Sequence, residues 1–570
     1  MSSSKIKIVC YHENIIKTFI IIILLVGICV LGRVVLNSFV GDDSGYIFHP
    51  YIQHQQVEKL FIGSSADLGG SSPITGQFYR PLMLTTISFI YLLFGKAAFA
   101  YHLLQLLFHI ANSLLIFFIL KKFGSYLTSF FLALIFLIHP INVETFAYVS
   151  NFQDVLFMFF GLSALFILTQ KRVSPLNFVF VIALLLCSFL SKETGILFAV
   201  MISAYLVLIM RTKNSLYYFS LFGLAIFYLF IRIGFAGVGF SKIALSPIGH
   251  LTLIERIYLI PNIFTHYLSV ILLPTNLAIG QVWITNSAFP IVSNLTLPAT
   301  LIAIIYLAYQ KFKVSRKKLY EFIFFALWFI VGLLIHIQII PLEMTVADRW
   351  FYFPFVGLLG MVAVSLKNIK IKHGQNTIIL SFIVLIVSAF SVRSFIRLSD
   401  WKDAITLYSH DTKVTDSYLL EHSLGFELMQ IGKMDQAESH FKKSIYLYKT
   451  PFNTNSMGVY FYKKGDIHNS LLWFEKSTTL GDYFLAYHNA ARLFLEVKDY
   501  KNAAIVLDKA TKKFPKSDVF YRLLALSEYK NENMKEAIKA ATSAYNISPT
   551  KENEYIFKQL LSGSELIIKD

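Results

Sequence analysis

Three features that identify other classes of protein are scarce or missing in this chain. It has three cysteines in 570 residues, far apart and two of them within or beside apolar runs, so neither a disulfide framework nor a cysteine metal motif is indicated. No spacing of His, Cys or carboxylate residues argues for zinc. The one glycine-rich candidate, Gly234-x-x-Gly237-x-Gly239, follows a predicted membrane span and lacks a P-loop lysine. Cysteine chemistry and nucleotide binding are therefore excluded as predictions.

Charged residues are also few. They make up 15% of the chain, against 56% hydrophobic and 16% aromatic residues, and the mean hydropathy is +0.60. This composition predicts a polytopic membrane protein with a polar appendage. The formal net charge is +17, but Lys and Arg cluster in short segments between apolar runs, which is the positive-inside pattern. We therefore expect a lipid bilayer, and no nucleic acid, as a partner.

Eleven apolar stretches are predicted to cross the membrane, since a helix needs about 20 apolar residues to do so. The first is too long for a signal-peptide core and has no clear cleavage site, so we interpret it as a retained span. The expected spans lie near residues 15–37, 98–120, 126–140, 152–170, 175–190, 194–210, 215–235, 294–310, 320–340, 350–366 and 376–395.

Basic segments set the expected orientation, because Lys and Arg are retained in the cytoplasm. They place the N-terminus inside and, after eleven crossings, the C-terminal region outside a cell membrane, with a bacterial or archaeal membrane favoured by the many Ile, Lys and Phe residues. Two further apolar stretches must then not cross. Pro81 to Phe94 is expected as a juxtamembrane helix within a first outer loop of about 38–97. Residues 254–273, which contain Pro261, are expected as a broken or re-entrant helix. The segments assigned to the cytoplasm are residues 121–122, 171–172, 211–213, 311–318 and 367–372.

A repeat begins where the apolar spans end. Small residues recur at positions 437, 470, 503 and 537, close to the 34-residue period of tetratricopeptide repeats. Phe441, Phe474 and Leu507 are expected to fill the groove between paired helices, and Pro515 and Pro549 to end second helices. The predicted fold class is all-α: a polytopic membrane helix bundle (1–395), a connector (396–410) and an α-solenoid of about four tetratricopeptide repeats (411–560), which we expect to dock a protein.

Two adjacent carboxylates, Asp42 and Asp43, stand just beyond the first span. An ionisable residue at the mouth of a membrane helix is by default a functional-site hypothesis. Adjacent side chains on an extended or turning backbone point in different directions, so one aspartate is expected to face a substrate and the other a positive partner. The alternative, a solvated turn or a helix cap, remains open.

The other suggestive polar residues all fall on the outer face in this orientation. Each also has a plainer interpretation: an interfacial ion pair for Lys192-Glu193, an aromatic-belt anchor for Asp348-Arg349, a helix cap for His139-Pro140. Asp and Glu contribute little to topology, so their convergence is partly independent of the orientation. The set comprises Arg80, His139, Glu144, Asp154, Lys192, Glu193, Arg256, Asp348 and Arg349.

Such an array suits glycosyl transfer from a lipid-linked phosphate donor. The acceptor hydroxyl needs a base or an orienting carboxylate, for which the catalytic candidates are Asp42, Asp43 and Glu144. The leaving phosphate needs positive charge. A divalent ion, Mg or Mn, held by Asp43, Glu144 or Asp154 is an open alternative. The candidates for binding donor phosphate are Lys192, Arg349, Arg80 and Arg256, and the supporting candidates are His139, Asp154, Glu193 and Tyr352.

The order of motifs along nearly the whole chain resembles that of the transmembrane and tetratricopeptide-repeat O-mannosyltransferases, and more broadly the multi-span glycosyltransferases of the C fold that use polyprenyl-phosphate sugars. Trp401 marks the usual entry into the repeats. The matching motifs are Asp42-Asp43 with Ile47, Phe78-Tyr79-Arg80-Pro81-Leu82, Tyr101-His102 with His109, His139-Pro140-Ile141-x-x-Glu144, Ser191-Lys192-Glu193-x-Gly195-Ile196 and Asp348-Arg349-Trp350-x-Tyr352-x-Pro354.

The resemblance implies that a first-loop aspartate, Asp42 or Asp43, acts as catalytic base or acceptor-orienting group. It also implies that Lys192 and Arg349 bind donor phosphate. Departures from the family pattern include Gly41 in place of an aromatic residue and Asn151-Phe152-Gln153-Asp154 in place of glycine-arginine-x-aspartate.

The sequence thus predicts an enzyme that moves a sugar, with mannose expected, from a polyprenyl (dolichyl or undecaprenyl) phosphate to Ser/Thr hydroxyls of a protein docked on the repeats. Two alternatives stay open. One is a ligase that moves an oligosaccharide or O-antigen from a diphosphate lipid, and the other is a non-catalytic scaffold whose spans only anchor the repeats.

Overall fold

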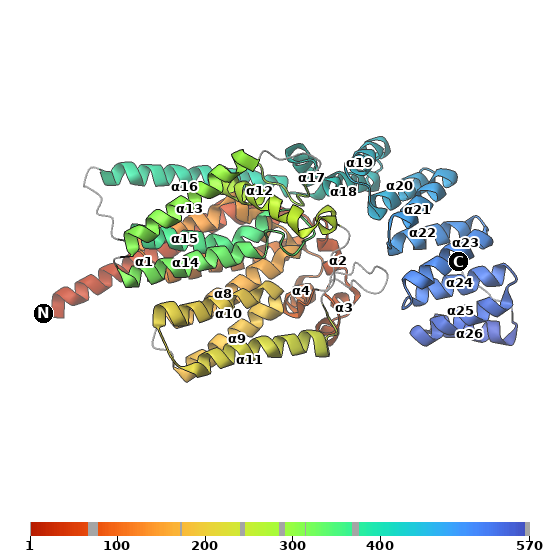
Figure 1. Cartoon of the computed structure of the whole chain (residues 1–570), viewed down its shortest axis with the longest axis horizontal. Helices are drawn as coiled ribbons and strands as arrows, with labels where there is room; N and C mark the ends of the chain where they lie inside the picture. The colour runs from red at the N-terminus through yellow and green to blue at the C-terminus, as the bar shows by residue number, and fades with distance from the viewer. Residues whose placement is uncertain are drawn as a thin grey trace. The chain divides into compact units, whose positions relative to one another are not determined.

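A computed structural model describes residues 2–65, 78–170, 174–239, 246–283, 291–313, 315–367 and 375–564. Within these ranges the chain is all-α, apart from one isolated β-bridge between Gln281 and Val346. It divides into two compact units, Met1–Leu420 and Glu421–Asp570. The predicted fold class, apolar membrane helices followed by stacked helix pairs, is confirmed (Figure 1).

All eleven predicted spans are helical. By length and composition, seven helices in the described part of the chain can cross a membrane, or eight if the bent pair 126–138 and 140–147 forms one span. The other three predicted spans, near 175–190, 294–310 and 320–340, are helices that do not meet this criterion. The helices are α1 (Ser2–Leu31), α2 (Asp43–Ile47), α3 (Pro50–Gln53), α4 (Pro81–Phe94), α5 (Ala98–Leu120), α6 (Tyr126–Ile138), α7 (Val143–Ala147), α8 (Phe152–Gln170), α9 (Pro175–Ser191), α10 (Ile196–Ala204), α11 (Ser215–Leu229), α12 (Leu253–Leu272), α13 (Ile291–Phe312), α14 (Arg316–Leu334), α15 (Tyr352–Leu366), α16 (Gln375–Asp400) and α17 (Ala404–Val414).

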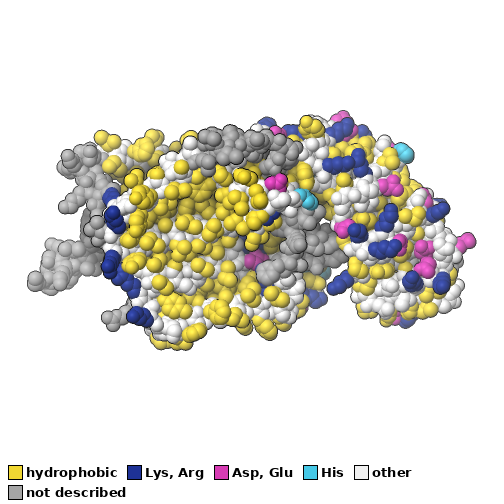
Figure 2. Space-filling view, viewed as in Figure 1, with side chains coloured by type: hydrophobic (Ala, Val, Ile, Leu, Met, Phe, Trp, Pro, Cys, Tyr) yellow, Lys and Arg dark blue, Asp and Glu magenta, His cyan; other side chains and the backbone are white. Residues whose placement is uncertain are grey.

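Large hydrophobic side chains cover the outside of the first unit. On α11, Phe219 and Phe222 are 70% and 66% exposed. Figure 2 shows a broad hydrophobic face over this unit, with Lys and Arg side chains gathered at one end of it. An apolar surface of this extent is unfavourable in water and suits contact with acyl chains. The chain is a multi-pass membrane protein.

Helix α12 differs from its prediction. It runs without a break from Leu253 through Pro261 to Leu272, so the expected break is wrong. A capping box between Thr252 and Glu255 provides hydrogen-bond acceptors for backbone N–H groups at the start of the helix. Proline removes only one backbone donor and is tolerated inside helices that pack in an apolar environment.

Residues 396–410, expected as a connector, are helical apart from a short turn between α16 and α17. Arg397 on α16 donates two hydrogen bonds to the Asp411 carboxylate on α17, Nη1 to Oδ1 at 2.7 Å and Nη2 to Oδ2 at 3.0 Å. Both side chains are almost fully buried. A bidentate buried pair of this kind fixes the angle between the helices it joins.

The chain bends at His139-Pro140, where α6 and the segment that contains α7 meet at 49°. Pro140 cannot continue α6, and the His139 Nδ1 atom accepts the Ile141 N–H at 3.2 Å. A 3-10 turn, Val149–Asn151, then leads into α8. The segment after this bend carries Glu144 on α7 and Asp154 in the first turn of α8.

The second unit is a stack of helix pairs. Its small positions Ala437, Ser470, Ala503 and Ala537 are fully buried, as is Phe441 against Gly425. The second helices stop before Pro515 and Pro549, as predicted. The pairs are α18 (Tyr418–Gln430) with α19 (Met434–Leu447), α20 (Pro451–Lys463) with α21 (Ile467–Leu480), α22 (Phe484–Glu496) with α23 (Tyr500–Lys513), and α24 (Asp518–Lys530) with α25 (Met534–Ile547), followed by α26 (Lys551–Ser562).

Candidate active site

The two adjacent aspartates have opposite surroundings. Asp43 opens α2 and is fully buried. Its Oδ1 accepts hydrogen bonds from the Ser150 N–H at 2.6 Å and the Ser150 hydroxyl at 2.7 Å, and its Oδ2 accepts the Val40 N–H at 3.0 Å. Burial raises the pKa of Asp43 to about 7, although these hydrogen bonds oppose the rise. Asp43 therefore ties the loop to the turn before α8 and does not face an open space.

Asp42 is exposed, yet protein surrounds it on several sides. Its carboxylate lies within electrostatic reach of Arg349 and Tyr46. Desolvation in this concave setting raises its pKa, while a hydrogen bond with Tyr148 and the charge of Arg349 oppose the rise. An accessible carboxylate with a raised pKa is a stronger proton acceptor than an ordinary aspartate.

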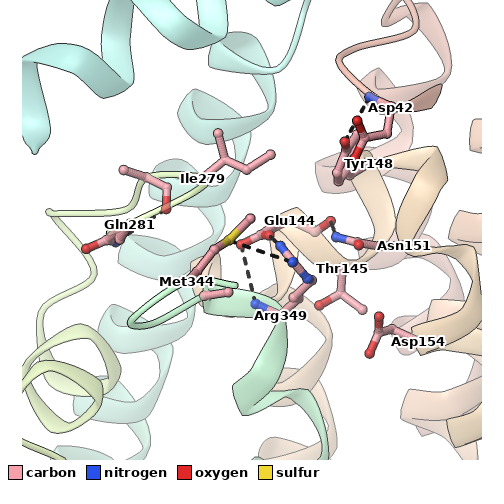
Figure 3. A network of polar contacts seen from close by, with 12 residues as sticks. Asp42, Glu144, Thr145, Tyr148, Asn151, Asp154, Ile279, Gln281, Met344 and Arg349 are labelled. Atoms are coloured by element: carbon pink, nitrogen blue, oxygen red, sulfur yellow. Dashed lines mark hydrogen bonds and ion pairs between the residues drawn. The ribbon is translucent and has the colours of Figure 1, made fainter. Parts of the chain in front are cut away.

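Three cations from distant parts of the chain form ion pairs and lie within electrostatic reach of one another. Arg349, just before α15, pairs with Glu144 of α7 through its guanidinium (Figure 3). Lys192, at the end of α9, places its Nζ 2.6 Å from Asp154 Oδ1.

Arg80 forms the third pair, with its Nε 3.1 Å from Glu193 Oε2. The Glu193 Oε1 atom accepts the Tyr79 N–H at 2.6 Å. A further cation, Arg232, lies 3.9 Å from the same carboxylate. Glu193 is thus shared between two arginines.

Lys192 and Glu193 are adjacent but point to different partners. Lys192 has extended backbone (φ −156°, ψ 142°) at the end of α9, and a 3-10 turn follows at once. Gly195 closes this turn against α9, where an added Cβ would lie 2.4 Å from the Ser188 carbonyl oxygen. Only glycine permits that approach, which explains the glycine of the lysine-glutamate motif.

A small pocket lies beside Lys192 and Arg349. Its polar side consists of these two cations, Asp154 and His336, and the remaining wall is mainly apolar, including Phe157 and Phe353. The Asp154 Oδ2 atom is buried without a hydrogen-bond partner. Burial lowers the pKa of Lys192, and the adjacent Asp154 carboxylate opposes that change. The pocket therefore joins positive charge to an apolar wall, which is what a phosphate attached to a hydrocarbon chain requires.

Four predicted site residues lie elsewhere or are engaged in packing. Arg256 donates all its hydrogen bonds to backbone carbonyls, those of residues 251, 338 and 339. His139 Nε2 bonds the Ile271 carbonyl at 3.0 Å. The Tyr352 hydroxyl is buried between His109 and Asn112. Glu144 is buried and its carboxylate is taken up by Arg349.

No group of three or more His, Cys, Asp or Glu side chains among the described residues could hold a metal ion. The three carboxylates considered for Mg or Mn are instead engaged separately. Asp43 accepts three protein hydrogen bonds, Glu144 pairs with Arg349 and Asp154 with Lys192. We therefore assign them to ion pairing and loop anchoring.

Sequence reasoning missed four residues of this cluster: Tyr148, Arg232, His336 and Glu343. Tyr148 is the most consequential, because its hydroxyl accepts the Asp42 N–H at 3.0 Å. Its position four residues after the outer-loop motif that ends at Glu144, next to the turn that binds Asp43, is the only signal that marks it in the sequence. Glu343 lies within electrostatic reach of Asp42, Arg80 and Arg349, and burial raises its pKa.

Known proteins with similar sequence cover much of the chain. The protein O-mannosyl-transferase F38B6.6 of Caenorhabditis elegans is 25% identical over 427 residues, which cover 72% of this chain and 60% of that protein. The chain is a distant homologue of protein O-mannosyl-transferases. The human protein O-mannosyl-transferase TMTC3 is 28% identical over 137 residues, 24% of this chain and 15% of its own length. The chain thus spans less than two thirds of these relatives. No protein-family model matches it.

Two solved structures match the chain at low similarity. ArnT from Cupriavidus metallidurans bound to undecaprenyl phosphate is 13% identical, with 76% of each chain covered and a TM-score of 0.34. YrrB, a TPR protein with an unusual peptide-binding site, is 13% identical, with 33% of this chain and 94% of that chain covered and a TM-score of 0.24. Similarity at this level carries no argument about function.

Proposed function

We propose that this chain is an integral membrane glycosyltransferase that moves a single sugar, mannose first among the candidates, from a polyprenyl phosphate to a Ser or Thr hydroxyl of a protein on the outer membrane face. The observation that carries the proposal is the exposed Asp42 carboxylate within electrostatic reach of Arg349, a cation that lines a pocket with an apolar wall. The distant homology to protein O-mannosyl-transferases supports the reaction class.

In this reaction Asp42 accepts the proton of the acceptor hydroxyl. The hydroxyl oxygen forms a bond to the anomeric carbon as the bond from that carbon to the phosphate oxygen breaks, and the lipid phosphate leaves. Arg349 and Lys192 stabilise the charge on the leaving phosphate, since both line the pocket. Phe157 and Phe353 contact the first part of the hydrocarbon chain.

The remaining charged residues orient these groups. Glu144 and Asp154 hold the two phosphate-binding cations in place, and Glu193 does the same for Arg80. Arg80 adds positive charge near the sugar-phosphate. Asp43 anchors the loop that carries Asp42. The repeats of the second unit bind the acceptor protein.

The proposal is tested by transfer of labelled sugar to protein in reconstituted membranes. The donors are polyprenyl-phosphate mannose, polyprenyl-phosphate glucose and a diphosphate-linked oligosaccharide. Transfer from a monophosphate donor that is lost in Asp42→Asn is the expected result. Transfer from the diphosphate donor alone would indicate a ligase instead.

A scaffold would behave differently. It would give no transfer from any donor in the reconstituted assay. In cells, the repeats expressed on an unrelated membrane anchor would then replace the whole chain. That outcome would overturn the proposal, because the cluster around Asp42 would be absent from the replacement.

A further inference from the structure

The loop that carries Asp42 is held by two neighbouring residues of one turn. The Asp42 N–H donates a hydrogen bond to the Tyr148 hydroxyl, and the Asp43 carboxylate accepts one from the Ser150 N–H. Each contact joins residues more than 100 positions apart in sequence. The two contacts therefore fix the loop at consecutive residues, which restricts both its place and its rotation.

The Tyr148 hydroxyl contacts Asp42 in two ways. Its oxygen accepts the Asp42 N–H at 3.0 Å (Figure 3). The hydroxyl also lowers the pKa of the Asp42 carboxylate, which favours its ionised form. A hydroxyl has one proton to donate and lone pairs to accept, so Tyr148 can accept the Asp42 N–H and keep its own proton for the carboxylate.

Gly41 provides the space for this arrangement. Its backbone has φ +54°, and a Cβ at this position would lie 2.9 Å from the Tyr408 hydroxyl and 3.0 Å from the Tyr148 hydroxyl. Two tyrosine hydroxyls thus converge where another residue would have its side chain. Gly41 is therefore required both by the backbone conformation and by the close approach of the tyrosines.

The tyrosine ring is itself fixed. Tyr148 is 7% exposed, and its ring lies against buried Trp401 with centroids 5.6 Å apart. Its carbonyl accepts a hydrogen bond from Gln105 Nε2 at 2.8 Å. The Tyr148 hydroxyl is therefore held in one position, as a residue that positions a reactive group requires.

We propose that Tyr148 is the positioning residue for Asp42, which it holds through the backbone N–H of that residue. This inference rests on the proposed role of Asp42 in transfer. Tyr148 does not touch the sugar or the lipid phosphate in this scheme. It acts through Asp42 alone.

The first test is kinetic and uses Tyr148→Phe in the full-length protein. Losing a hydrogen bond to a charged group should lower kcat about tenfold or more and leave the KM for the lipid donor unchanged. The acid limb of the kcat profile should move to higher pH, because the lost bond favoured ionised Asp42. Tyr205→Phe, which removes the hydroxyl of another buried tyrosine, is the matched control and should match the wild type.

The second test needs no catalytic activity. Labelling of carboxyl groups by a water-soluble carbodiimide, followed by mass spectrometry, reports the protonation of Asp42 as pH is varied. Tyr148→Phe should shift the Asp42 labelling profile to higher pH, with buried Asp43 labelled slowly in both proteins. An unchanged profile would overturn the inference even if no donor supported transfer.

The outcomes separate the two proposals. Wild-type kinetics in Tyr148→Phe, with Asp42→Asn inactive, would overturn the positioning role and leave the function intact. An inactive wild type with a shifted labelling profile would overturn the function and leave the Tyr148–Asp42 interaction standing.

Discussion

Arg349 is bound to Glu144 across 205 residues of sequence, through its guanidinium and through its backbone N–H at 3.4 Å from Glu144 Oε2. The pair links the segment just before α15 to the short helix α7. Because Glu144 is buried and Arg349 lines the pocket, the carboxylate orients a cation of the pocket wall.

Arg349→Lys should raise the KM for the lipid donor about tenfold with a smaller effect on kcat. Lysine keeps the charge but cannot present a planar pair of donors to Glu144 and phosphate together. Donor titration in reconstituted membranes measures this. Arg256→Lys is the control: its guanidinium bonds only backbone carbonyls, so the donor KM should stay at the wild-type value. An equal rise in both variants would refute the assignment of Arg349.

Asp43 should contribute a pH dependence to stability. Its pKa is about 7 in the folded protein against 3.8 ordinarily, so the folded state binds more protons than the unfolded state between these values. The contribution of Asp43 to the free energy of unfolding is therefore full below about pH 4 and falls as pH rises towards 7. Thermal unfolding of the purified protein across pH 4 to 8 measures the slope.

Asp43→Asn is the comparison for that slope. Asparagine does not titrate, so the difference in unfolding midpoint between the two proteins should change across the same pH window and become constant above it. A difference that is constant from pH 4 to 8 would show that Asp43 does not titrate as described.

Gly357→Ala should destabilise the packing of α15 against α14. An added Cβ would lie 2.5 Å from the Phe329 backbone nitrogen and 2.9 Å from the Phe325 carbonyl oxygen. Backbone atoms cannot move aside as a flexible side chain can, so we expect a loss of about 1–3 kcal/mol. The thermal unfolding midpoint should fall accordingly. Gly223→Ala on α11, where a Cβ meets no atom within 4 Å, should leave the midpoint unchanged or raise it.

Phe474→Ala should open the repeat array locally. Phe474 is 3% exposed, and its ring packs closely against Gly458. A Cβ added at Gly458 would lie 2.5 Å from the Phe474 Cδ1 atom. Removing a buried ring of this kind costs about 3–5 kcal/mol. Limited proteolysis of the full chain should show new cleavage near α20 and α21. Leu472→Ala, on the same helix but 49% exposed, should keep the wild-type pattern.

Periodic features were predictable from the sequence because each depends on local spacing. The small residues at 437, 470, 503 and 537 are buried as expected, and each predicted span is a helix. The continuity of α12 was not predictable from Pro261 alone, because its capping and its packing depend on the rest of the first unit.

The candidate site was predictable only in part. The sequence placed Asp42 and Asp43 together but could not tell which is exposed, since that depends on Ser150, more than 100 residues away. Tyr148 and Arg232 carry no motif of their own, and their roles arise from contacts between distant segments. The prediction for Arg256 failed for a related reason. Its charge suggested that it binds phosphate, but in the folded chain its guanidinium donates hydrogen bonds to backbone carbonyl groups.

The turns between paired helices of the second unit each place one residue in left-handed backbone. Gly432 and Gly465 hold this position in the first two pairs, with φ +78°, but Lys498 and Glu532 hold it in the next two, with φ +62° and +65°. A side chain in that conformation costs about 1 kcal/mol where glycine costs little. Since stability in such arrays is the sum of each repeat and its neighbours, the last two helix pairs are expected to open more readily than the first two.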